Sequence, residues 1–135
     1  TILVYTPMKL KRIHHIAVIC SDYVLSKSFY TEVLGLKIIS EVYREDRKSY
    51  KLDLSLNGTY QIELFSFPDA PSRVSFPEAC GLRHLAFETE DIHAAFEELI
   101  SKGIPVEAIR TDPYTGKRFF FFSDPDGLPV ELYES

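Results

Sequence analysis

Two short stretches of the sequence decide the fold: HIAVICSD at residues 15–22 and HLAFETED at residues 84–91. Each begins with a histidine, continues with an apolar run that is typical of a strand, and ends with an aspartate. Because the same pattern recurs at the same spacing, we predict two copies of one structural module.

After each aspartate the hydrophobic pattern takes the period of a helix. Asp22 and Asp91 are favourable N-cap residues, and Gly35 and Gly103 suit the left-handed residue that follows a helix. The predicted helices, residues 22–34 and 91–102, bury Phe29, Tyr30, Phe96 and Leu99.

Beyond each helix, apolar and polar residues alternate with the period of a strand. Asn57-Gly58 and Asp124-Pro125-Asp126-Gly127 are turn signals between consecutive strands. Each copy is therefore strand, helix and three strands, which gives an α+β fold of two βαβββ modules. The strands predicted after the helices are residues 36–43, 50–56, 60–66, 106–111, 117–123 and 129–133.

Length and composition fit one domain of 135 residues. We divide the chain into an N-terminal extension (residues 1–9), module 1 (10–67), a proline-containing linker (68–79) and module 2 (80–135).

Charge and cysteine content narrow the class of protein. Twenty acidic and 15 basic residues give a formal net charge of −5, which argues against a nucleic-acid binder. No apolar run approaches the roughly 18 residues of a membrane-spanning helix, so we expect a soluble protein that does not bind membranes. Cys20 and Cys80 are too few for a disulfide framework. We therefore expect a cytoplasmic protein in which Cys20 is a buried thiol.

The alternation also sorts polar side chains by face. Glu63 and Glu131 each lie between two apolar residues of a strand, so they point to the face opposite the apolar one. His15 and His84, at the start of the first strand of each module, point to the same polar face. His14 is expected to point to the helix side.

One histidine and one glutamate thus recur at equivalent positions. Taken singly, each glutamate can be an exposed or ion-paired residue, and each histidine a satisfied polar residue at a sheet edge. Their recurrence favours a metal site, because all four side chains would converge on one point if the modules pack about a pseudo-twofold axis. Whether the two modules of one chain or modules of two chains close the site stays open. Imidazole nitrogen and carboxylate oxygen suit zinc, nickel, cobalt, iron or manganese. The predicted ligands are His15, Glu63, His84 and Glu131.

Longer motifs resemble a known family. HIAV (residues 15–18), QIELF (61–65), RHLAF (83–87) and DPDGLPVELYE (124–134) resemble the vicinal-oxygen-chelate superfamily, in particular glyoxalase I and its small YaeR-type subgroup. The resemblance implies a pseudo-twofold cup of curved mixed sheet and the same four metal ligands. It also implies one divalent ion per site (nickel, cobalt or zinc) and a homodimer.

The resemblance further implies the chemistry. Glyoxalase I converts the hemithioacetal of a 2-oxoaldehyde and a thiol through an enediolate, which a divalent metal stabilises while a carboxylate moves the proton. By resemblance Glu131 is the first choice for the base, with Glu63 opposite it. Ile19 and Phe67 stand where glyoxalase I has an Arg and an Asn that hold glutathione, which counts against glutathione as co-substrate.

The expected substrate is a small molecule bound between aromatic walls. Candidate substrate-binding residues are Phe65, Phe67, Arg118 and Tyr133. Arg44, Arg47 and Lys117 are further cations that could hold an anionic substrate and are otherwise solvated surface charges.

Two alternatives stay open: an epimerase of the methylmalonyl-CoA type or another metalloenzyme of the superfamily, and a non-catalytic drug-binding module of the bleomycin-resistance type. Glu63 counts against that epimerase, because those relatives typically carry Gln at this position. The ligand quartet counts against the drug-binding module.

Overall fold

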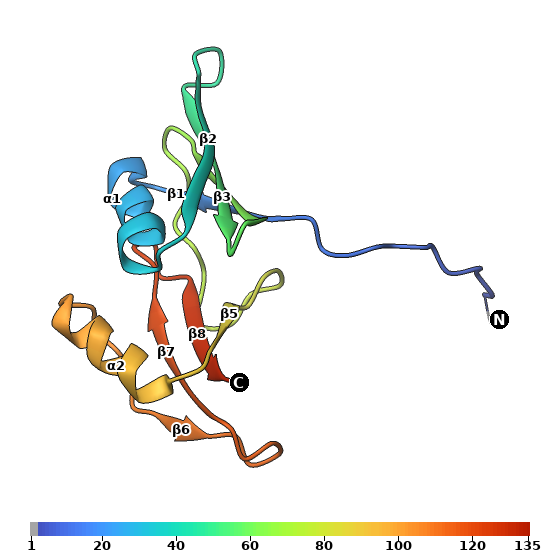
Figure 1. Ribbon diagram of the computed structural model, residues 1–135. Helices are drawn as coiled ribbons and strands as arrows, with labels where there is room; N and C mark the ends of the chain where they lie inside the picture. Colours follow the sequence, from blue (N-terminus) through green and yellow to red (C-terminus); the bar gives the residue numbers. More distant parts are fainter. Residues whose placement is uncertain (1–2) are drawn as a thin grey trace.

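A computed structural model describes residues 3–135, so the first two residues of the expected N-terminal extension lie outside it. The fold is α+β, as the sequence predicts (Figure 1). Module 1 comprises β1 (Ile16–Cys20), α1 (Tyr23–Ser28), the π-helix η1 (Phe29–Val33), β2 (Lys37–Arg44), β3 (Ser49–Leu56) and β4 (Thr59–Ser66). Module 2 comprises β5 (Leu85–Thr89), α2 (Ile92–Ser101), β6 (Arg110–Thr111), β7 (Arg118–Ser123) and β8 (Pro129–Glu134).

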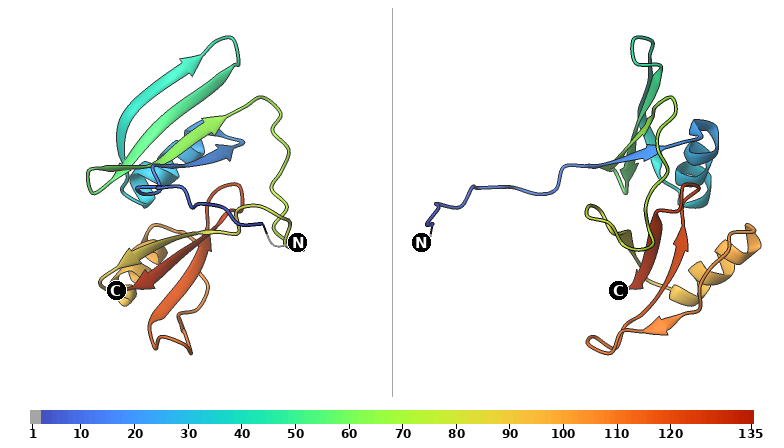
Figure 2. Two further views of the ribbon diagram at one scale, coloured as in Figure 1. Left: turned by 90° about the vertical axis from the view of Figure 1, so that its right-hand side faces the viewer. Right: turned by 180° about the vertical axis from the view of Figure 1, so that it is seen from behind.

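The two modules form two separate mixed sheets with the same topology. Their strand orders are β1-β4-β3-β2 and β5-β8-β7-β6, and in each sheet the first strand pairs in parallel with the last. The helices lie on the same side of both sheets, and within residues 3–135 no helix covers the opposite face (Figures 1 and 2). We call that opposite side the open face of each module. The N-terminal arm, residues 3–15, extends away on this side (Figure 2).

The predicted caps start both helices. The Asp22 carboxylate accepts a hydrogen bond from the Leu25 amide at 3.1 Å, and the Asp91 carboxylate accepts one from Ala94 at 3.0 Å. The first helix differs from the prediction in its second half, which widens into a π-helix. Its last turn is closed by a 3.0 Å bond from the Leu34 amide to the Phe29 carbonyl, five residues back.

The strand expected over residues 106–111 is shorter than predicted and covers only Arg110–Thr111. Before it, the Glu107 amide donates a single hydrogen bond to the Phe121 carbonyl, and no continuous ladder forms. Ile104, Val106 and Ile109 pack against the core instead. The apolar pattern of this segment therefore reflects packing at a sheet edge rather than strand pairing.

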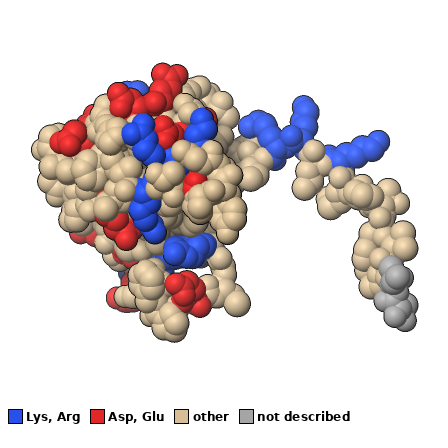
Figure 3. Space-filling view, turned by 90° about the horizontal axis from the view of Figure 1, so that it is seen from below, with Lys and Arg blue, Asp and Glu red and all other residues tan. Residues whose placement is uncertain are grey.

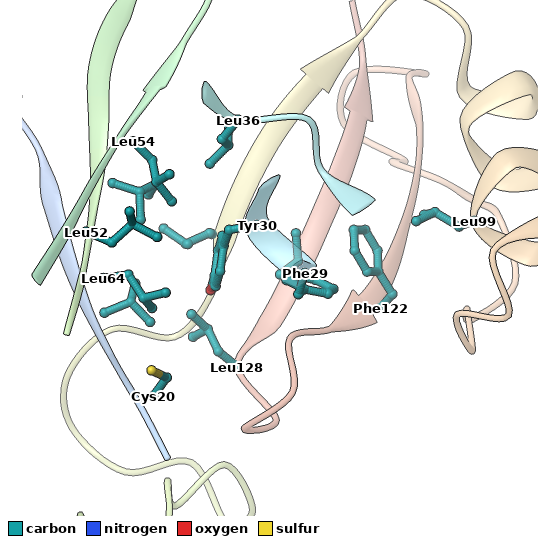
Figure 4. Packing of buried hydrophobic residues seen from close by; sticks show 14 of the residues in the cluster. Cys20, Phe29, Tyr30, Leu36, Leu52, Leu54, Leu64, Leu99, Phe122 and Leu128 are labelled. Carbon is teal, nitrogen blue, oxygen red and sulfur yellow. The ribbon is translucent and has the colours of Figure 1, made fainter. Parts of the chain in front are cut away.

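One core joins the two modules through Tyr30. This side chain has no exposed surface and lies between the leucines of sheet β1–β4 and the Phe29 and Leu128 side chains (Figure 4). Its hydroxyl donates a 2.8 Å hydrogen bond to the buried Asp124 carboxylate in the turn between β7 and β8. Burial raises the pKa of Asp124, and hydrogen bonds from Tyr30 and from the Leu128 amide hold its charge. The turn predicted from Asp124 to Gly127 thus also fastens module 2 to module 1.

Other predictions about composition can be compared with the structure. Cys20 is a buried free thiol, and burial raises its pKa to about 11, as expected for an unreactive thiol. No helix within residues 3–135 has the length and apolar character needed to cross a membrane. Seen from below, the surface mixes Lys and Arg with Asp and Glu side chains (Figure 3).

Candidate functional site

The first half of the expected site lies on the open face of module 1. His15 directly precedes β1, and Glu63 lies in β4 opposite Ala17. The His15 Nε2 atom is 3.7 Å from Glu63 Oε1. The prediction that these two side chains share the polar face is therefore confirmed.

Neighbouring side chains hold the other oxygen of Glu63. Tyr60 donates its hydroxyl proton toward Glu63 Oε2 at 3.2 Å, and the Lys51 ammonium lies 3.4 Å from the same atom. Both groups also bond Asp53, each at 2.9 Å, so the two carboxylates share the single hydroxyl proton of Tyr60. Oε2 is thus anchored by protein donors, while Oε1 faces the imidazole.

The charges in this network stabilise one another. The hydrogen bond to Asp53 raises the pKa of Lys51, so the ammonium stays charged. Burial works to raise the pKa of Asp53, but hydrogen bonds from Lys51 and Tyr60 lower it overall. Burial and the bond to Asp53 raise the pKa of Tyr60, so its hydroxyl remains a donor at neutral pH.

The imidazole of His15 is positioned by aromatic contacts. It stacks on Tyr60 with ring centroids 4.9 Å apart and an angle of 5° between the planes. Its Nδ1 lies 2.8 Å from Nδ1 of His14, whose ring meets Tyr60 edge-on. The expectation that His14 points to the helix side is wrong: it is exposed, precedes β1, and belongs to this cluster.

The second half of the expected site has the same backbone register. Glu131 pairs with Ala86 across β8 and β5, as Glu63 pairs with Ala17, and His84 directly precedes β5. The His84 ring meets Phe121 edge-on at 5.2 Å, and its Nδ1 atom is buried without a hydrogen-bond partner. On its other side Glu131 faces Phe121 of β7.

Within one chain the two halves stay apart. Among residues 3–135, no cluster of three or more His, Cys, Asp or Glu side chains could hold a metal ion. The donor set nevertheless fits a divalent cation, because each half offers an imidazole and a carboxylate on a face without a covering helix. The unpartnered His84 nitrogen also shows that the chain alone does not satisfy this histidine.

The expected substrate-binding residues fall into two groups. Phe65 and Phe67 stack on each other beside Glu63, and Tyr133 lies on the open face of module 2, stacked on Phe119. Arg118 is not brought to this face. It alternates with the open-face residues of β7, pairs with Glu134 at 3.0 Å, and lies 2.6 Å from His93 of α2.

The sequence did not predict three residues that contact Glu63 or its partners: Tyr60, Lys51 and Asp53. Lys51 and Asp53 alternate with the apolar Leu52 and Leu54. This alternation could have predicted that both lie on the same face as Glu63. Tyr60 gives no such signal, because the register shift between Leu54 and Ser55 interrupts the alternation that would relate Tyr60 to Glu63.

Comparison with known proteins places the chain in a family. The family model of the Glyoxalase/Bleomycin resistance protein/Dioxygenase superfamily matches residues 12–132. The chain therefore belongs to this superfamily, as the motifs predict.

Close relatives agree over nearly the whole chain. The uncharacterized protein YwkD of Bacillus subtilis (strain 168) is 66% identical over 94% of this chain and 99% of its own length. The uncharacterized protein YaeR of Escherichia coli (strain K12) is 63% identical over 93% and 97%. The crystal structure of a glyoxalase family protein from Enterococcus faecalis is 46% identical, covers 94% of this chain and 100% of its own, and superposes with a TM-score of 0.86.

Proposed function

We propose that the protein is a metal-dependent lyase or isomerase that moves a proton between adjacent carbons of a small oxo compound. The leading substrate class is the adduct of a 2-oxoaldehyde with a thiol. The observation that carries this proposal is the repeated register: each module presents a histidine and a glutamate at equivalent positions of its open face.

The four residues would meet when two copies of the chain associate. His15 and Glu63 of one copy would face His84 and Glu131 of the other, and a twofold axis would create two such sites. Two features of the described part of the chain support a homodimer: its open faces carry no covering helix, and the N-terminal arm exposes apolar side chains. On this arm Met8, Leu10 and Ile13 expose 82%, 80% and 71% of their surface.

A divalent ion such as nickel, cobalt or zinc would supply Lewis-acid stabilisation of the negative charge that develops on the substrate oxygens. The chain's own residues divide the remaining work. Glu63 is held in position, because Tyr60 and Lys51 contact its Oε2. Glu131 is set against the aromatic Phe121 and would take the proton from one carbon and return it to the next.

The apolar side chains around the half-sites would exclude water and bind the carbon skeleton. Ile19 pairs with Phe65 across β1 and β4 and exposes 56% of its surface on the open face. Since glyoxalase I has an Arg at the Ile19 position, a thiol other than glutathione fits this surface better.

The experiment is purification without added metal, followed by elemental analysis, chelation and restoration with nickel, cobalt or zinc. Turnover would be screened with several 2-oxoaldehydes, each combined with different thiols. We expect one metal per chain in a dimer, loss of turnover after chelation, and recovery with at least one metal. A folded protein that takes up none of these metals would contradict the proposal.

A second candidate function is supported by a different cavity. A groove of about 870 Å³ lies between α1, η1 and the start of β8, lined by apolar residues such as Phe29, Val106 and Pro129. Its size and lining suit a bulky aromatic ligand, as in a drug-binding module. Metal-free protein that binds such a ligand stoichiometrically, and that turns over no oxo compound, would favour this function.

A further inference from the structure

Arg44 occupies an unusual position at the end of β2, on the open face of module 1. Its guanidinium carbon lies 4.9 Å from the centre of the Phe65 ring and 5.8 Å from that of Phe67. A second cation, Arg47, lies 5.3 Å from the Phe67 ring. Two arginines thus lie over one pair of stacked aromatic rings.

Within residues 3–135, no carboxylate forms an ion pair with Arg44. Its Nη2 donates a 2.9 Å hydrogen bond to Ser49, which is neutral and fully buried, and its Nε is buried without any partner. Glu45 and Asp46 lie in the following turn, yet within residues 3–135 neither forms an ion pair with an arginine. A half-buried guanidinium with free donors is stabilised by an anion.

The position of Arg44 relates it to the candidate metal ligands. Phe65 follows Glu63 by two residues on the same face of β4, which separates the two by about 7 Å along the strand. Arg44 itself pairs with Ser49 of β3. Ser49 is four residues along this strand from Asp53, the partner of Glu63, which is a distance of roughly 13 Å. The guanidinium therefore lies within the length of a small molecule from Glu63.

We propose that Arg44, with Arg47 beside it, binds the carboxylate or phosphate group of the substrate. The inference rests on the proposed function, in which the oxo end of the substrate lies at Glu63. The substrate class is then an anionic oxo compound or thiol adduct whose acid group lies about 7 to 13 Å from the reacting carbons. Phe65 and Ile19 cover the apolar span between the two ends, and the planar fork of Arg44 binds two oxygens of the anion.

Anion binding can be measured without metal or turnover. Inorganic phosphate and propionate would be titrated separately into the full chain, with the amide resonances of Ser49 and Phe65 followed by NMR. We expect saturable shifts that weaken about tenfold or more in Arg44→Met and less in Arg44→Lys, which keeps the charge but not the fork. Saturation by phosphate alone, or by propionate alone, identifies the acid group.

Lys37→Met is the matched control, since it removes the same charge from the other end of the same strand. Unchanged binding in Lys37→Met supports the site, whereas equal losses in both variants, or no saturable shift in the wild-type protein, would overturn it. The spectrum of each variant reports whether it is folded. If anions bind at Arg44 but no metal or turnover is found, the proposed function fails and the anion site stands.

Turnover gives a second, independent comparison. Adducts of one 2-oxoaldehyde with 6-mercaptohexanoate and with 6-mercaptohexanol differ mainly in a terminal carboxylate, and both are long enough to span the distance from Glu63 to Arg44. Arg44→Met is expected to lower kcat/KM about tenfold or more for the charged adduct and to leave the uncharged one within about twofold. Equal losses for both adducts would contradict a role in binding the acid group.

Discussion

The open faces of the two modules share a backbone but differ in chemistry. Beside Glu63, module 1 places Asp53, Lys51 and Tyr60, which form a network of hydrogen bonds. In module 2, Phe121 pairs with Glu131 and is equivalent to Asp53, and Phe119, two residues away, is equivalent to Lys51. The same register therefore presents one glutamate held by donors and one glutamate among aromatic rings.

This difference supports the proposed division of roles between the two glutamates, which the sequence alone does not distinguish. A carboxylate with one oxygen fixed by Tyr60 and Lys51 is suited to stay in place as a metal ligand. A carboxylate without such donors is free to rotate between a metal and a substrate carbon. The comparison therefore favours Glu63 as the fixed ligand and Glu131 as the base.

The largest effect is expected from removing the base. Glu131→Gln should lower turnover by about 10²- to 10⁴-fold while the protein keeps some metal, because the amide cannot accept the proton. Glu63→Gln should instead reduce metal content first. Rates with elemental analysis of both variants measure the contrast, and Glu134→Gln, whose side chain pairs with Arg118 on the other face, is the control. Undiminished activity in Glu131→Gln would remove this residue from the base role.

The network around Glu63 predicts the next largest effect. Tyr60→Phe keeps the stacking on His15 but removes the hydroxyl that bonds Asp53 and Glu63. We expect metal affinity to fall about 10- to 100-fold, as measured by competition with a chelator. Tyr133→Phe is the matched control in module 2, because its hydroxyl bonds Asp112 and not a predicted ligand. Equal affinities of the two variants would show that the faces do not differ in this way.

A stability measurement tests whether the two modules unfold as one unit. Tyr30→Phe removes the buried hydrogen bond between module 1 and Asp124 of module 2. We expect the free energy of unfolding to fall by about 1 to 3 kcal/mol, with a single urea transition. Tyr114→Phe, at a position that is 95% exposed, should leave the transition unchanged. Two separate transitions in the wild-type protein would instead mean that the modules fold independently.

The smallest effect is expected at Arg118. Its side chain is engaged by Glu134 on the helix side of β7, away from the open face. Arg118→Met should therefore leave kcat/KM within about twofold of the wild-type value, measured alongside Arg44→Met on the charged adduct. A loss as large as that of Arg44→Met would return Arg118 to the list of substrate-binding residues.

Local patterns in the sequence predicted most of the secondary structure elements and their order. The capping aspartates, the alternation of strands and the turn signals act over a few residues, so they predicted the order of elements and the face of each glutamate. The π-helix at Phe29 and the short β6 were not predictable in this way, because both depend on packing against distant parts of the chain.

The pairing of Asp53 with Glu63 shows the limit most clearly. A regular hairpin at Asn57-Gly58 would not bring these two residues opposite each other. A bulge after Leu54 shifts the register by one residue, and this shift pairs Asp53 with Glu63. By itself the sequence determined two equivalent His and Glu positions, since alternation is a local property of each strand. Only the tertiary structure decided which glutamate is held by donors and that one chain keeps the halves apart, because both follow from contacts between distant strands.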